Sequence, residues 1–197
     1  MRFHLGAIPI SPDFVPDPSW TRLRELSPWP EKLVVFPIGV AAAAIVAGLW
    51  FLITPLRDVT PALSLRGFLF SFVGIVVVHE LIHALVHPMA GLSSHSIVGF
   101  SPSEMFFYAN YDGEMSRNRL VAILLMPLLI ISIVPLLVSA VVQVPSAWAA
   151  LVSVMNAFLS CSDMLLAGLL LFQVPAGRIV RFKSWKTYWK EHDTAAA

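Results

Sequence analysis

Two histidines and a glutamate lie within five consecutive residues, His79-Glu80-Leu81-Ile82-His83, and form the pattern H-E-x-x-H. On a helix, side chains four residues apart share one face, so the two imidazoles can bind one zinc ion. Glu80 is then placed to act as a general base on a water molecule at that ion. The alternative is a polar patch that hydrogen-bonds neighbouring helices.

The composition around this motif is strongly apolar. The chain has 197 residues, of which 57% are hydrophobic and 13% charged, and its mean hydropathy is +0.78. These values exclude an ordinary soluble domain and predict an integral membrane protein. The motif ends an apolar run that begins at Gly67. Ionisable groups in a membrane helix are costly, which favours a functional site.

Four apolar stretches are long enough to cross a bilayer. They are residues 33–54, 67–86, 120–144 and 147–174. Pro127 and Pro135 in the third stretch predict kinks, whose freed carbonyls find partners in neighbouring helices or water. We therefore expect an all-α membrane protein with a domain of about four helices at 33–175. A Pro-rich arm precedes it at 1–32, and a basic aromatic tail follows at 176–197.

The segments outside the spans give three weaker expectations. In the arm, Ser19 could cap a short helix at 19–26. Between the second and third spans, 96–100 and 105–111 resemble the two strands of a hairpin, which could offer an edge to an extended peptide; the alternative is a plain loop. The tail at 176–192 is expected to form an interfacial helix on an anionic leaflet.

A polar stripe on the fourth span supplies the expected third zinc ligand. Ser153, Asn156, Ser160 and Asp163 are spaced by three, four and three residues, which places them on one helix face. A catalytic zinc ion takes three protein ligands and keeps a fourth position for water, so Asp163 is the candidate. Asn156 could orient substrate or stabilise the oxyanion. The alternative for the stripe is interhelical hydrogen bonding.

Two further histidines are not expected to bind the ion. On a straight helix His79 and His87 are about 12 Å apart, too far for one metal. His87 is therefore expected to support the site or to lie at the membrane interface. His95 falls in the polar connection, where a lone histidine is more often without a metal role.

Charge asymmetry predicts the orientation in the membrane. The arm, the 89–119 connection and the tail together carry eleven lysines and arginines, whereas the connection between the first two spans carries two. The positive-inside rule then places both termini in the cytoplasm, in what we expect to be a prokaryotic cell membrane. The second and fourth spans run in the same direction, so Asp163 comes within one or two helical turns of the depth of His79 and His83.

With these residues in view, the chain resembles the site-2 type of intramembrane zinc metalloproteases. It is most similar to a branch of small prokaryotic membrane proteins described as zincin peptidases of unknown function. The resemblance covers about residues 65–175. It rests on the motif at 79–83, the segment 115–120 leading into the span with Pro127, and Asn156 followed by the segment 160–163.

The resemblance implies that His79, His83 and Asp163 hold zinc and that Glu80 is the base. Two positions depart from the better-known site-2 proteases. Met164 follows Asp163 where they carry a glycine, and Met126 precedes Pro127 where many of them carry a glycine.

We therefore expect a zinc metallopeptidase with one zinc ion per chain that cuts a peptide bond in or near the membrane. Its expected partners are membrane lipid and a membrane protein or peptide substrate, and no nucleic acid. A metal or proton transporter is one alternative, although Ser71 is the one polar side chain in 68–78. A catalytically silent metal-binding scaffold is the other, although it would not need Glu80.

Overall fold

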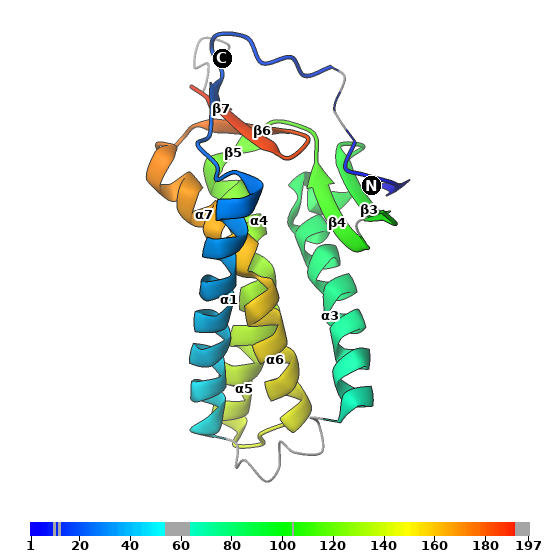
Figure 1. Cartoon of the computed structure of the whole chain (residues 1–197), viewed down its shortest axis with the longest axis vertical. Helices are drawn as coiled ribbons and strands as arrows, with labels where there is room; N and C mark the ends of the chain where they lie inside the picture. The colour runs from blue at the N-terminus through cyan, green and yellow to red at the C-terminus, as the bar shows by residue number, and fades with distance from the viewer. Residues whose placement is uncertain (10, 12, 54–63, 104, 192–197) are drawn as a thin grey trace. The chain divides into compact units, whose positions relative to one another are not determined.

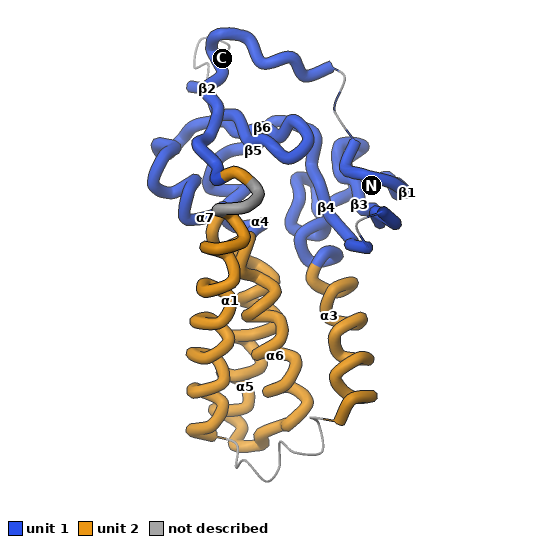
Figure 2. Tube along the Cα trace, in the orientation of Figure 1, with its two compact units in different colours: residues 1–26, 80–124, 166–197 blue, residues 27–79, 125–165 orange. Residues whose placement is uncertain are grey.

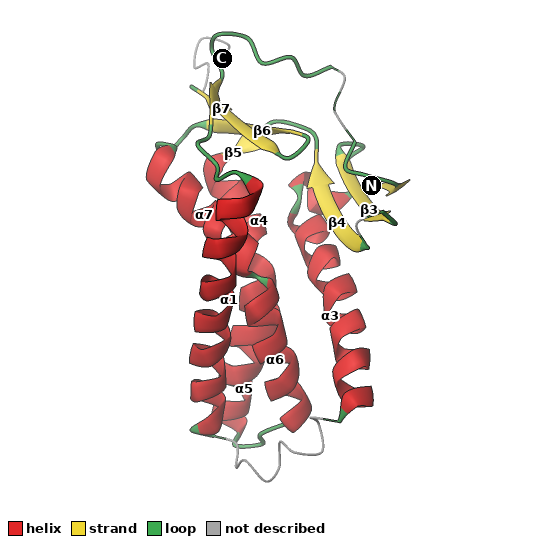
Figure 3. Cartoon of the chain, in the orientation of Figure 1, coloured by secondary structure: helices red, strands yellow, loops and turns green. Residues whose placement is uncertain are grey.

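The computed structural model describes residues 1–9, 11, 13–53, 64–103 and 105–191. It is mostly helical, with two small sheets (Figures 1 and 3). The chain forms two compact units, each built from separate stretches of sequence (Figure 2). Unit 1 comprises Met1–Leu26, Glu80–Leu124 and Leu166–Ala197, and unit 2 comprises Ser27–His79 and Leu125–Leu165.

Unit 2 is a bundle of apolar helices. It contains α1 (Pro28–Phe51), the first part of α3 (Leu65–Val86), the π-helical segment η3 (Leu128–Ile133), α5 (Val134–Val142), α6 (Ala147–Leu159) and the start of α7 (Cys161–Gln173). Its core includes Trp50 of α1 and Ala157 of α6. At Gly39 the backbone of α1 comes so close to α6 that a Cβ atom would lie 3.0 Å from the Phe158 carbonyl.

The prediction of membrane-crossing stretches is confirmed by length and composition. Three helices, Glu31–Phe51, Leu65–Val86 and Arg117–Val142, are long and apolar enough to cross a membrane. The expected end of the first span, near Thr54, lies outside the described residues. Pro28 and Pro30, in the arm, are part of α1. Prolines are tolerated there because the first backbone N–H groups of a helix have no intrahelical partner.

The fourth predicted span, 147–174, consists of two helices rather than one. Ala147–Leu159 and Cys161–Gln173 meet at a 50° bend, and the pair makes a fourth span if it is counted as one. Ser160 lies between them, and its hydroxyl donates to the Asn156 carbonyl at 2.9 Å. This bond back to the preceding turn is a known cause of helix bending.

The third span is also interrupted, as its prolines predict. Helix α4 (Arg117–Pro127) continues through η3 into α5. Pro135 has no N–H to offer the carbonyl of Ile131, four residues earlier. That carbonyl accepts a hydrogen bond from the Ser153 hydroxyl on α6, at 3.2 Å. The predicted transfer of a freed carbonyl to a neighbouring helix is therefore confirmed.

Unit 1 contains both sheets. Sheet A has the order β1 (Arg2–Leu5), β3 (Ser96–Ser101), β4 (Phe106–Tyr111), with β1 parallel to β3 and β3 antiparallel to β4. The predicted hairpin is β3–β4. Sheet B has the order β2 (Thr21–Arg22), β7 (Lys186–Lys190), β6 (Ile179–Lys183), β5 (Met115–Ser116). The all-α expectation therefore holds for the spans and is incomplete for the rest.

Two expectations for the ends of the chain are wrong. The short helix at 19–26 is absent, because Thr21 and Arg22 pair with β7. The tail forms the antiparallel hairpin β6–β7 rather than an interfacial helix. Its β-branched and aromatic residues favour strands. Val180 and Thr187 are fully buried in unit 1, so their packing outweighs the amphipathic pattern read as a helix.

Candidate metal centre

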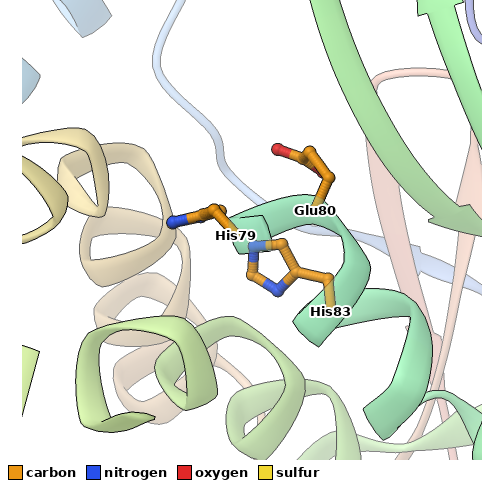
Figure 4. Close-up of side chains that lie close together, drawn as sticks. All are labelled: His79, Glu80 and His83. Atoms are coloured by element: carbon orange, nitrogen blue, oxygen red, sulfur yellow. The ribbon is translucent and has the colours of Figure 1, made fainter. Parts of the chain in front are cut away.

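The three motif residues lie together on α3. The metal-binding atoms of His79, Glu80 and His83 are all within 4.8 Å of one another (Figure 4). Because α3 is a continuous helix, its own geometry sets this spacing. Each histidine is only 6% exposed. The helix thus presents two buried imidazoles and a carboxylate that together can form part of a metal site.

The backbone of α4 sets the tautomer of His83. Its Nδ1 is 2.9 Å from the Ile123 carbonyl oxygen. A carbonyl only accepts hydrogen bonds, so Nδ1 must carry the proton. In the neutral ring the lone pair is then on Nε2. A histidine commonly binds a metal in this way, with one nitrogen as the ligand and the other donating its proton to an acceptor.

The tautomer of His79 follows from Asn156 by a similar argument. The Asn156 side chain faces the Pro127 carbonyl at 3.0 Å and the Ser132 hydroxyl at 2.9 Å. Because Pro127 can only accept, the amide nitrogen must point there, and the amide oxygen points at Nδ1 of His79, at 2.9 Å. Nδ1 of His79 therefore carries its proton, and the neutral ring has its lone pair on Nε2.

Asp163 faces that lone pair. Its Oδ2 is 3.0 Å from Nε2 of His79. With a neutral imidazole and an ionised carboxylate both atoms are acceptors, so the contact requires a cation shared between them or a proton, carried by His79 or by Asp163. Two ligand atoms of one tetrahedral zinc ion, each about 2.0–2.2 Å from the metal, lie about 3.3–3.6 Å apart. The observed 3.0 Å lies just below that range, and two imidazoles with a carboxylate are a donor set that zinc accepts, so the types of the residues present fit zinc.

The polar stripe of the fourth span lies in the interior of unit 2. Ser153, Asn156 and Ser160 are 0% exposed. Ser153 and Asn156 make interhelical hydrogen bonds, as the alternative for the stripe proposed, and Asp163 contacts His79. Both N–H groups of Asn156 already donate within the protein. Asn156 thus contacts His79 at Nδ1, the ring nitrogen that is not the candidate ligand atom. A role of Asn156 with substrate stays a prediction.

Glu80 is held by sheet A, a contact that the sequence did not reveal. Its Oε2 accepts a hydrogen bond from the backbone N–H of Ala109 at 2.7 Å. Ala109 belongs to β4, which forms one edge of sheet A. No side chain signals this contact, because the donor is a main-chain group. The carboxylate of the candidate base thus lies directly beside a strand edge.

His87 and His95 are not in the metal-binding cluster of the described residues. The His87 ring is buried, with Nδ1 2.8 Å from the Ser96 hydroxyl. Burial, with the nearby His83 and Arg119 as smaller causes, lowers the pKa of His87 to about 4. Nδ1 of His95 is 2.7 Å from Asp112. The hydrogen bond of His87 goes to Ser96 and not to a candidate ligand, so its supporting role stays a prediction.

Two arginines bind the ends of α3 and α7, and sequence reasoning missed this role. Arg119 donates to the carbonyls of Val86 and His87 at 2.9 and 3.1 Å. Arg117 donates to the Val174 carbonyl at 2.8 Å. The last carbonyls of a helix have no intrahelical partner and carry partial negative charge, which a guanidinium satisfies. The signal in the sequence was the pair of arginines at the start of the third span.

The comparison with known families agrees with this geometry. A family described as "Putative zincin peptidase" matches residues 72–179, more than half of the chain. The matched stretch contains the whole of the H-E-x-x-H motif, Asn156 and Asp163. No curated protein and no solved structure matches the chain. The chain belongs to this family, whose description implies zinc as its metal.

Proposed function

We propose that the protein is a membrane-embedded zinc metallopeptidase of the site-2 type, with one zinc ion held by His79, His83 and Asp163. The observation that carries the proposal is the contact between Nε2 of His79 and Oδ2 of Asp163, two acceptors 3.0 Å apart. Two acceptors face each other at this distance only with a cation or a proton between them. The His83 tautomer supplies a further ligand atom from the same helix.

Each residue of the site has a separate role in the proposed reaction. When bound, zinc supplies a Lewis acid and lowers the pKa of a coordinated water. Glu80 accepts the proton of the attacking water and returns it to the leaving amine. Asn156 and the Ile123 carbonyl hold the two imidazoles in the tautomer that ligates. The Ala109 N–H fixes one oxygen of Glu80 and so limits the rotation of the base.

An extended peptide is the substrate form that this arrangement favours. A helical amide is hydrogen-bonded and shielded, so a membrane helix must unwind locally before attack. Strand β4 is an edge strand, and the Glu80 carboxylate lies at its Ala109. The Ala109 N–H is taken by Glu80, so a peptide would add to this edge beside Ala109, where its carbonyl groups would come next to the base. Cleavage would thus occur in or near the membrane, with both termini of the enzyme in the cytoplasm of a prokaryotic cell.

Zinc content tests the ligand set. We would measure metal by elemental analysis on detergent-purified wild type, Asp163→Ala and Glu80→Gln, with His95→Ala as the control. Wild type, Glu80→Gln and His95→Ala are expected to hold about one zinc per chain, and Asp163→Ala to lose most of it. Wild type without metal, or Asp163→Ala with a full complement, would contradict the proposal.

Cleavage requires a separate test, because a silent scaffold would also bind zinc. Wild type and Glu80→Gln would be reconstituted with membrane proteins from a prokaryote, and new peptide N-termini would be compared by mass spectrometry. The proposal expects N-termini that appear with wild type and not with zinc-loaded Glu80→Gln. Equal sets of N-termini would leave a metal-binding protein without peptidase activity.

A further inference from the structure

Where all three of its strands pair, one face of sheet A carries only apolar side chains; farther along the β3–β4 pair the same face continues in Ser96 and Tyr111. Residues paired across neighbouring strands share a face, and the registers run Phe3–Val98–Ala109 and Leu5–Phe100–Phe107. The face consists of Phe3, Leu5, Val98, Phe100, Phe107 and Ala109. None of the six side chains carries a polar atom. We call this surface the apolar face of sheet A.

The two faces of the sheet differ in burial. On the opposite face, Ile97 and Tyr108 are each 3% exposed and Asn110 is also buried. On the apolar face, Phe3 is 73% and Leu5 65% exposed, and the four residues of β3 and β4 are half-buried. The end of this face at Ser96 and Tyr111 is buried against His87. An antiparallel hairpin with one face packed normally presents polar side chains on the other. Here the open face is the apolar one, so water is the wrong medium for it.

Contacts within unit 1 place this sheet beside the end of a candidate membrane helix. The Ala109 N–H of β4 reaches Glu80, and α3 ends six residues later at Val86. Six residues of α-helix correspond to about 9 Å along its axis. Leu81 and Leu85, in this last stretch, are exposed apolar residues. The edge of sheet A thus lies level with the apolar, exposed part of α3, short of its end (Figure 2).

We propose that the apolar face of sheet A lies against lipid acyl chains at the membrane interface. Helix α3 is long and apolar enough to cross a membrane, and the edge of the sheet contacts it at Glu80, six residues before its end. A sheet at that depth meets lipid on its open face. On the edge of β4 the Ala109 N–H is bonded to Glu80, in keeping with the rule that polar groups away from water find partners.

This inference does not depend on metal or catalysis, and it has a mechanical consequence. A sheet seated on lipid holds β4, and with it the hydrogen bond to Glu80, at a fixed depth. Arg2 projects from the other side of β1 and pairs with Asp112 at 2.8 Å. Strand β1 therefore separates a lipid-facing side, Phe3 and Leu5, from a polar side, Arg2.

Site-directed spin labels on β1 test the proposal. In a Cys161→Ala background, single cysteines at Phe3, Leu5 and, as the matched control on the opposite face, Arg2 would carry a nitroxide label. The proteins would be reconstituted in vesicles of phosphatidylethanolamine and phosphatidylglycerol. Collisions with oxygen, which concentrates in lipid, would be compared with collisions with a water-soluble nickel chelate. The oxygen-to-nickel ratio is expected to be severalfold higher at positions 3 and 5 than at position 2.

Two outcomes would overturn the proposal. Nickel collisions at positions 3 and 5 as frequent as at position 2 would place the face in water. Low accessibility to both reagents at positions 3 and 5 would mean that protein covers the face, either a second copy or a bound peptide. A Leu5→Trp variant gives a second measurement in case labelling disturbs folding. Its added fluorescence is expected to be quenched by lipids brominated on their acyl chains and not by iodide.

Discussion

The interior of unit 2 and the apolar face of sheet A invert the usual placement of polar and apolar groups. In unit 2, polar side chains on α6 are buried among apolar helices, and Ser153 and Asn156 are bonded to carbonyls of η3 and its preceding proline. In sheet A, the apolar side chains of Phe3 and Leu5 are exposed. A soluble protein keeps unpaired polar groups outside and large apolar patches inside.

The difference teaches that each region is adapted to a medium without water. Polar groups inside an apolar bundle are stable only where they satisfy one another, and the Asn156 amide does so with a carbonyl, a hydroxyl and an imidazole. An exposed apolar face is stable only against another apolar phase. The comparison predicts that substitutions inside unit 2 act through lost contacts within the protein. Substitutions on the apolar face of sheet A should act mainly through contact with the surrounding medium.

The largest expected effect contrasts the two faces of sheet A. Ile97→Ala removes a buried side chain from the packed face and should cost about 2–5 kcal/mol in the free energy of unfolding. Leu5→Ala, on the apolar face, should cost less than about 1 kcal/mol in detergent because that side chain has little packing to lose. Thermal unfolding of the purified variants measures both. Equal losses would show that the apolar face is packed against protein.

Acid should lower the free energy of unfolding of the protein through the buried imidazole of His87 in unit 1. Its pKa is about 4 in the folded protein against 6.5 normally, with burial as the main cause. As pH falls from 6.5 to 4, the unfolded chain takes up a proton that the folded chain refuses, so stability decreases. At 1.36 kcal/mol per pH unit, the loss approaches about 3 kcal/mol.

The variant His87→Gln lacks this titration and should lose less stability over the same window. Both proteins would be unfolded thermally in detergent at pH 7 and pH 4, with a chelator throughout so that zinc release adds nothing. Stability above pH 6.5 should not depend on this proton. An equal acid-induced loss in wild type and variant would show that His87 does not titrate in this way.

The spans and the metal motif could be predicted because their signals are local. Hydropathy alone places the helices, since a membrane span is defined by its own length and composition. The spacing of His79 and His83 is likewise a property of a single helix. Asp163 was found because it is the one charge in an apolar segment. Its contact with His79 bears out that the two residues come together, while its role as a ligand stays a prediction.

The sheets could not be predicted in full because their partners are distant in sequence. Arg2 pairs with Ile97, and Thr21 with Trp189. No local pattern in the arm or the tail reveals such pairings, and the short strands there resemble loops or an amphipathic helix when taken alone. The Ala109 N–H that holds Glu80 belongs to the same class, because a backbone donor has no sequence signature.

Asn156 tests whether the buried polar groups of unit 2 serve the metal. Asn156→Ala removes the acceptor that orients His79 and should weaken zinc binding by about 10–100-fold, the usual cost of losing such a support. Ser153→Ala is the matched control, because Ser153 lies on the same stripe and donates to the Ile131 carbonyl rather than to a candidate ligand. Zinc competition with a fluorescent chelator measures both. An unchanged zinc affinity in Asn156→Ala would mean that the stripe serves packing alone.

The smallest expected effect concerns the arginines at the helix ends. Arg119 holds the end of α3, which carries the motif, and Arg117 holds the end of α7, which carries Asp163. Replacing either with alanine frees helix-end carbonyls and should lower zinc affinity by up to about tenfold, or about 1.4 kcal/mol.

Arg181→Ala is the matched control for both arginines, since Arg181 also donates to a backbone carbonyl, that of Asp112, but not at a helix end. Lysine at position 117 or 119 should restore part of the affinity because it retains the charge without the planar fork. Zinc affinity and thermal stability would be measured side by side. If Arg117→Ala and Arg119→Ala lowered stability as Arg181→Ala does and left zinc affinity unchanged, the helix ends would matter for folding and not for the metal. A loss of affinity beyond the control would instead show that the positions of α3 and α7 are set in part by two side chains that never touch the site.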